Sequence, residues 1–107
     1  MANENCTIIV DAQSVPFFPK AYGYAKEFII TSGGQKNRKS LKNNLSLKIG
    51  DEFLEEILFD PQTSGGLLIS IPNGYSGNLL EKLKENGVSA AIVAKVAQRK
   101  DVNIIVS

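Results

Sequence analysis

The stretch Leu58–Ile71, LFDPQTSGGLLISI, decides the fold that we expect for this chain. An apolar approach leads into a compact polar loop, and the loop leads into a second apolar run. Pro61 fixes its own φ and favours an extended Asp60, so a preceding helix has to end there. The pair Gly65–Gly66 permits positive φ and a close backbone approach. The run Leu67–Ile71 predicts a buried, central strand, because it is continuously apolar and bounded by turn residues.

The polar loop between these apolar runs admits two interpretations. Gln62, Thr63 and Ser64 supply amide and hydroxyl groups without fixed charge. A rigid strand that presents such a loop is a common way to hold an anion. An ordinary helix-to-strand connection has the same composition, because Gly, Pro, Asp and Ser are the usual turn residues. Composition alone leaves both interpretations open.

Charge is segregated in the middle of the chain. Every ionisable residue between Glu27 and Asp51 is basic, whereas the ten residues Asp51–Asp60 carry five acids and no base. The basic block follows Gly33-Gly34, and glycine together with Lys and Arg is typical of phosphate binding. A long, mobile, solubilising loop over Thr31–Asn44 explains the block equally well, because that segment has no periodicity.

For the acidic block we prefer a short helix over Glu52–Leu58, capped by Asp51, to a metal site. Acids in the first turn of a helix are favoured by the macrodipole, whereas metal clusters usually draw ligands from several elements. Cys6 is interpreted as a strand residue rather than a nucleophile.

The remaining helices and strands are predicted from the spacing of apolar residues and from the Gly, Pro and Asn residues that end such elements. A helix from about Pro19 carries an apolar stripe of Phe18, Tyr22, Ala25 and Ile29. Together the elements predict one α/β layered domain over residues 1–107, with a mixed sheet and helices mainly on one face. The other predicted elements are strands at Cys6–Val10 and Leu45–Ile49, a helix at Ser76–Asn86 ended by Gly87, and a hairpin of Ala90–Val96 with Val102–Val106.

Composition excludes several classes of function. The chain has 107 residues, 43% hydrophobic and 21% charged, as an ordinary globular domain does. It has no histidine and one cysteine, which excludes an internal disulfide and a Ser-His or Cys-His pair. A net charge of +1 argues against a nucleic-acid partner. No apolar run is long enough to span a membrane, the start is no signal peptide, and a lone cysteine suits a reducing, cytoplasmic compartment.

Two motifs resemble the selenophosphate synthetase (selenide, water dikinase) family. The segment Phe59–Leu68, FDPQTSGGLL, is similar to the family's signature near its C-terminal end. The segment Ser32–Arg38, SGGQKNR, resembles its Gly-Gly-x-x-x-Asn-type loop. The likeness runs from about Cys6 to Val106, but the family is a two-domain enzyme, so this chain looks like its C-terminal domain alone.

The resemblance implies a function and a set of partners. The family makes selenophosphate, AMP and phosphate from ATP, selenide and water, with Mg²⁺ on the phosphates. Its fold is that of the aminoimidazole ribonucleotide synthetase superfamily, in which an N-terminal domain dimerises and carries most nucleotide contacts. Carried over by motif, the cleft-facing residues would be Gly33, Gly34, Asn37, Arg38, Asp60, Gln62, Thr63, Ser64, Gly65 and Gly66.

The resemblance also marks what this chain lacks. Cys6 lies in no Gly-rich segment with a Lys partner, so it does not match the family's reactive Cys or selenocysteine, and no complete catalytic set or metal site is expected here. We therefore expect the isolated chain to be inactive and to bind no cofactor. Two alternatives remain: a domain of another ATP-dependent enzyme of the superfamily, which the DPQTSGG string disfavours, and a free-standing binding module.

Overall fold

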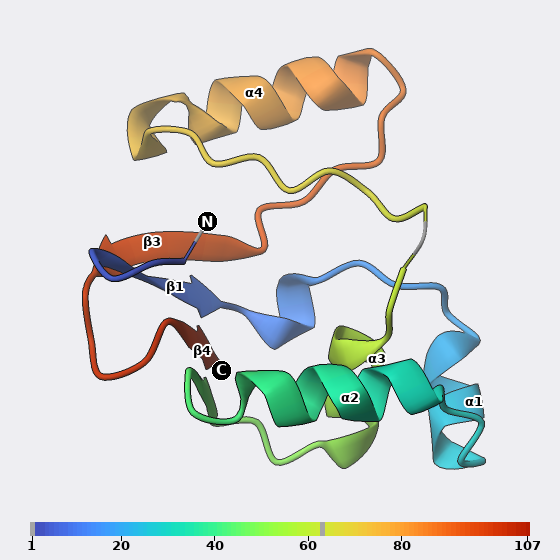
Figure 1. Cartoon of the computed structure of the whole chain (residues 1–107). Coiled ribbons are helices and arrows are strands. Elements are labelled where there is room, and N and C mark those ends of the chain that lie inside the picture. Colours follow the sequence, from blue (N-terminus) through green and yellow to red (C-terminus); the bar gives the residue numbers. More distant parts are fainter. Residues whose placement is uncertain (1, 63) are drawn as a thin grey trace.

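A four-stranded mixed sheet organises the fold of this computed structural model, which describes residues 2–62 and 64–107 (Figure 1). The strand order is β2-β4-β1-β3, with β1 antiparallel to β3 and parallel to β4, and β4 parallel to β2. The expected layered α/β domain with a mixed sheet is confirmed. The strands are β1 (Cys6–Val10), β2 (Leu45–Leu47), β3 (Ala94–Gln98) and β4 (Ile104–Val106).

Four α-helices and one 3-10 helix accompany the sheet in the described part of the chain. Figure 1 shows α4 apart from the other three α-helices, which gather at the opposite end of the molecule. None of these helices is long and apolar enough to cross a membrane. The helices are η1 (Ala12–Ser14), α1 (Ala21–Lys26), α2 (Ser32–Leu41), α3 (Glu52–Phe59) and α4 (Asn73–Glu85).

The core lies between α3 and one face of the sheet. Ala12, Leu54 and Val106 form its buried centre, and partly buried residues of β1, β2 and β4 pack around them. The helix predicted at Glu52–Leu58 is confirmed, one residue longer at its C-terminal end. Asp51 caps it as expected, because its carboxylate accepts hydrogen bonds from the backbone N–H groups of Phe53 and Leu54 at 3.1 Å.

A hydrogen bond from α1 reinforces this cap. The Tyr22 hydroxyl donates to Asp51 Oδ2 at 2.7 Å, and the Tyr22 ring meets Phe53 edge-on. The hydroxyl, followed by the Leu54 N–H, lowers the pKa of the Asp51 carboxyl, and the same bond raises the pKa of Tyr22. The charged form of the cap is therefore favoured, and α1 is fixed against α3.

The predicted C-terminal hairpin is wrong. β3 and β4 both pair with β1, which lies between them, so they are not neighbours in the sheet. A central position suits β1, because its Ile8–Val10 run then has a hydrogen-bonded ladder on both sides. The connection between β3 and β4 crosses the end of β1 and is tied to it by Thr7, whose side chain is fully buried.

Thr7→Val is expected to lower the free energy of unfolding by about 1–2 kcal/mol, because it removes two hydrogen bonds without changing side-chain volume. The Thr7 hydroxyl donates to the carbonyl of Val102 at 2.7 Å and accepts from the N–H of Lys100 at 2.8 Å. Thr7→Ser is the matched control, since it keeps the hydroxyl. Urea unfolding monitored by circular dichroism measures the difference, and equal stability of Thr7→Val and wild type would contradict the role of this hydroxyl.

The loop predicted over Thr31–Asn44 is also wrong, because Ser32–Leu41 forms α2. Thr31 caps this helix by accepting the N–H of Gly34 at 3.2 Å. Periodicity missed the helix because Gly33 and Gly34 have low helix propensity and the segment has almost no apolar stripe. Its stability comes from contacts with α3, chiefly the salt bridges of Arg38 to Glu55 and Glu56. The segregated charge blocks therefore neutralise each other in part.

The central strand predicted at Leu67–Ile71 is not formed. The segment pairs with no strand, and Leu67 and Leu68 are 92% and 58% exposed. Its apolar composition is therefore not matched by burial within the described chain. The apolar stripe predicted around α1 is half correct: Ala25 is buried and Tyr22 packs against the core, whereas Phe18 and Ile29 lie outside α1 and are exposed.

The other predicted elements are found with small shifts. β1 has its predicted bounds, and β2 covers the first three residues of the strand predicted at Leu45–Ile49. α4 begins at Asn73, three residues before its predicted start, and Gly87 follows its end with φ of +73°. A left-handed glycine after the last turn is the usual helix stop.

Candidate functional site

The two sequence motifs, far apart in the chain, lie against each other. Thr31 Oγ1 donates a hydrogen bond to Asp60 Oδ1 at 2.9 Å, and Asn37 Nδ2 donates to the carbonyl of Phe59 at 3.0 Å. The start of α2 thus packs on the end of α3 and on the loop that follows. Gly33 permits this contact, because a Cβ there would lie only 2.6 Å from Cγ of Pro61.

The two glycines of α2 are expected to respond differently to alanine. Gly33→Ala should lower stability, because its Cβ collides with the Pro61 ring and has to push the loop away from α2. Gly34→Ala should be neutral or stabilising by up to about 1 kcal/mol, since its Cβ would meet neighbours at 3.5 Å, an ordinary contact, and alanine favours helix. Thermal unfolding of the two variants checks this, and a Gly33→Ala variant as stable as Gly34→Ala would contradict the contact.

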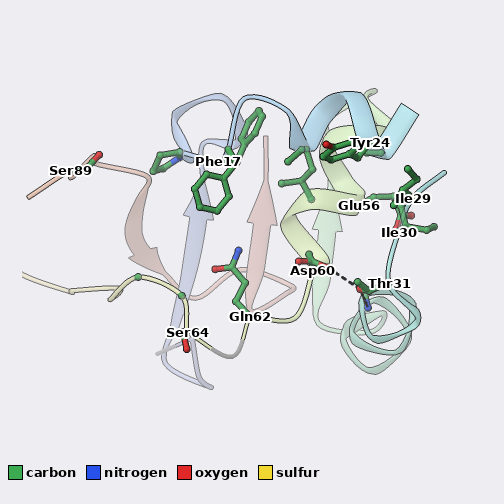
Figure 2. A pocket seen from close by; sticks show the side chains of 18 residues that line it. Phe17, Tyr24, Ile29, Ile30, Thr31, Glu56, Asp60, Gln62, Ser64 and Ser89 are labelled. Carbon is green, nitrogen blue, oxygen red and sulfur yellow. Dashed lines mark hydrogen bonds between the residues drawn. The ribbon is translucent and has the colours of Figure 1, made fainter. Parts of the chain in front are cut away.

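A cavity of about 790 Å³ opens beside these motifs (Figure 2). Its polar side comes from the signature loop and the start of α2, and its apolar side from the segment around α1. Figure 2 shows the Gln62 amide pointing toward Phe17 across the cavity, while the Ser64 side chain points away. Gly65 gives Gln62 its room, because a Cβ there would lie 2.5 Å from Gln62 Oε1. The apolar side is formed mainly by Phe17, Phe18, Tyr24, Ile29 and Ile30.

The cavity lining carries acidic but no basic side chains among the 18 described residues that form it. Its two carboxylates already have partners, since Asp60 accepts from Thr31 and Glu56 pairs with Arg38. The available donors on the polar side are the Gln62 amide and backbone N–H groups. These groups can orient a polar ligand, but they do not neutralise a highly charged one.

Arg38 lies outside this cavity. Its guanidinium forms salt bridges with Glu55 at 2.7 Å and Glu56 at 3.0 Å, and it stacks 4.9 Å from the centre of the Phe59 ring. A second, smaller hollow of about 340 Å³ is lined by Arg38, Lys39 and Lys42 together with Leu45 and Leu47. The structure therefore assigns Arg38 first to holding α2 on α3.

The predicted site residues thus divide into groups. Those that line the cavity are Gly34, Asp60, Gln62, Ser64, Gly65 and Gly66. Gly33 and Asn37 do not line the cavity but contact the segment Phe59–Pro61 and so hold the two motifs together. Arg38 lines the smaller hollow instead. Thr63 lies outside the described residues. The aromatic side was missed by sequence reasoning. The adjacent Phe17-Phe18 between Pro16 and Pro19 was the available signal, because two phenylalanines in a proline-bounded loop need an apolar environment.

The described residues bring together no cluster of three or more metal-binding side chains. Within residues 2–62 and 64–107, no group of three or more Asp, Glu, Cys or His side chains could hold a metal ion. The acidic block instead caps α3 and pairs with Arg38.

The fold and the joined motifs define a mixed α/β domain with a glycine-containing loop at the rim of a cleft. No protein-family model matches the chain. Curated proteins do match the chain, and the following three carry the name "Selenide, water dikinase". The protein of Desulfitobacterium hafniense is 35% identical over 98% of this chain, that of Agathobacter rectalis 37% over 100%, and that of Campylobacter jejuni 36% over 100%.

These matches show what the chain is similar to. Over nearly its whole length it resembles a C-terminal-like domain of the selenide, water dikinases. The chain spans 31–32% of the length of these three relatives. The resemblance carried by FDPQTSGGLL is thereby confirmed over nearly the whole chain.

Proposed function

We propose that this chain serves as the C-terminal domain of an enzyme that makes selenophosphate from ATP, selenide and water, releasing AMP and phosphate. The observation that carries the proposal is the similarity to selenide, water dikinases across 98–100% of the chain. In this proposal the signature loop forms one wall of the nucleotide cleft. The other wall and most of the phosphate contacts belong to an N-terminal domain, which also forms a homodimer.

Within the cleft, the chain's own residues would orient rather than neutralise the substrate. The Gln62 amide faces the cavity, and the Ser64, Gly65 and Gly66 backbone can offer N–H groups at its rim. Preorganised neutral donors stabilise charge that develops on a transferred phosphoryl group. Asp60, held by Thr31, fixes the loop in position.

The cations needed for phosphoryl transfer would come from elsewhere in the enzyme. Charge neutralisation on the phosphates is the chemistry that Mg²⁺ would supply, and the described residues provide no group of three or more acidic, Cys or His ligands for it. Arg38 would act on a phosphate only after leaving Glu55 and Glu56. We accordingly propose that the isolated chain hydrolyses no ATP, that it works with the N-terminal domain in the cytoplasm, and that nucleic acid and membrane are not its partners.

A chimera tests the proposed function. The matching segment of the Desulfitobacterium hafniense relative is replaced by this chain, and selenophosphate formation from ATP and selenide is measured. The chimera is expected to be active, and Gln62→Ala within it should lower turnover on the order of 10²-fold, because it removes a donor from the cleft. Gln13→Ala, at the exposed middle residue of η1, is the matched control and should leave turnover unchanged. A folded chimera without activity, or equal rates for both variants, would refute the proposal.

A further inference from the structure

One region of the chain combines high exposure with a complete lack of charge. The twenty residues Pro61–Leu80 contain no Asp, Glu, Lys or Arg, and neither do the eight residues Gly87–Ala94. These segments lead into α4, form its first two turns and connect it to β3. Exposed protein surface normally carries charges at frequent intervals, so such long neutral stretches need an explanation.

Large apolar side chains on and beside these segments are exposed to solvent. Leu67 is 92% exposed, Tyr75 63% and Ile92 52%, and Val96 on the adjoining β3 is 56% exposed. No residue of α4 is buried. We call the more than half-exposed large apolar residues of these two charge-free segments, Leu67, Leu68, Ile69, Tyr75 and Ile92, the neutral surface. In Figure 1 its elements are α4, the segment that precedes it and the connection to β3, all away from α1–α3.

Other exposed apolar residues have a different setting. Phe28 is 79% exposed, but it follows Lys26 and Glu27 directly. Phe18 is 86% exposed, but it belongs to the apolar side of the cavity beside α1. Scattered apolar residues among charges are normal on a free surface, whereas a large apolar area without charge marks an interface. Depletion of charged residues at the centre is the compositional sign of such interfaces.

We propose that the neutral surface is where this domain packs against the remaining two-thirds of a selenide, water dikinase. This inference rests on the proposed function and deepens it by naming the contact between the two parts. The partner surface would be apolar and uncharged, because an unpaired charge facing this area would be desolvated without compensation. The relatives carry about 69% of their length outside the matched region, enough to supply such a surface.

A covalently joined partner is favoured over a second copy of the chain. Linkage within one polypeptide gives an effective concentration in the millimolar range for a short connection, which exceeds ordinary protein concentrations. The β3 edge away from β1 is open as well, so the partner can also cover backbone groups there. Burial on this scale also accounts for the apolar run Leu67–Ile71, which finds no place in the core of the chain itself.

The test uses two separate polypeptides. This chain is mixed with the remaining part of the Desulfitobacterium hafniense relative, and association is measured by isothermal titration calorimetry. The wild-type chain is expected to bind with a micromolar or tighter dissociation constant. Leu67→Asp and Tyr75→Asp should each weaken binding at least about 10-fold, because they place a charge at the centre of the interface. Phe28→Asp is the matched control and should bind as wild type does.

Two further readouts sharpen the result. Circular dichroism of the Asp variants should match wild type, since Leu67 and Tyr75 are exposed in the isolated chain. Sedimentation of the chain alone should give a monomer; a dimer broken by Leu67→Asp would assign the surface to a second copy and overturn the proposal. Failure of the wild-type chain to bind, or equal weakening by Phe28→Asp, would overturn it as well. Association without selenophosphate formation by the chimera would instead count against the proposed reaction alone.

Discussion

Leu54→Ala is expected to lower the free energy of unfolding by about 2–5 kcal/mol, the largest effect among single substitutions considered for this chain. Leu54 is 9% exposed and lies with Ala12 and Val106 at the centre of the core. Truncation removes buried apolar atoms and leaves a cavity between α3 and the sheet, and neither rigid element can close it fully. Chemical denaturation, followed by circular dichroism, measures the loss.

Leu68→Ala is the matched control for this substitution. It makes the same chemical change, but Leu68 is 58% exposed and outside the core cluster, so the expected loss is under about 1 kcal/mol. The sequence pattern alone predicted the opposite result, since it placed Leu68 in a central strand. Equal losses from the two variants would show that Leu67–Ile71 is buried in the isolated chain, and the neutral surface would then be smaller than proposed.

Local sequence signals predicted an element correctly where the interactions that form it lie within the same segment. Asp51 followed by acids and then apolar residues predicted α3 correctly, because the cap and the first-turn charges all act within a few residues. The β-branched run of β1 and the glycine stop after α4 were found for the same reason. In each case, the sequence nearby contains the interactions that decide the element.

Non-local contacts explain the failures. α2 forms although its glycines disfavour a helix, because Arg38 and Asn37 bind α3 residues about twenty positions further along the chain. β3 and β4 are separated by β1 because the connection between them is held by the buried Thr7. The apolar run at Leu67 predicted burial from composition, and composition does not say whether a surface is covered by its own domain or by another one.

The candidate site shows the same division. The motif residues around Gly33 and Asp60 were identified from sequence, and the structure brings their segments together through Thr31 and Pro61. The aromatic wall of the cavity was missed, because the signal of Phe17-Phe18 between two prolines is not a known motif, and the fold revealed it. Arg38 was assigned by charge to a phosphate, yet its nearest anions are two carboxylates of α3.

Arg38→Met is therefore expected to lower the free energy of unfolding by about 1.5–3 kcal/mol. The substitution keeps the apolar stem beside Phe59 but removes both salt bridges, and it leaves the carboxylate of Glu55, whose side chain is only 12% exposed, without its partner. A charge that is mostly removed from water and unpaired is costlier than the pair was. Because Glu56 is more exposed, at 23%, its share of the loss should be the smaller one.

A double-mutant cycle separates the salt bridge from simple truncation. If Arg38 acts mainly by neutralising Glu55, then Glu55→Gln in the Arg38→Met background should recover part of the lost stability, whereas Glu55→Gln alone should destabilise wild type. Arg38→Lys is the matched control for charge, since it keeps a cation but cannot bridge two carboxylates with a planar fork. Wild-type stability of Arg38→Met would contradict this role.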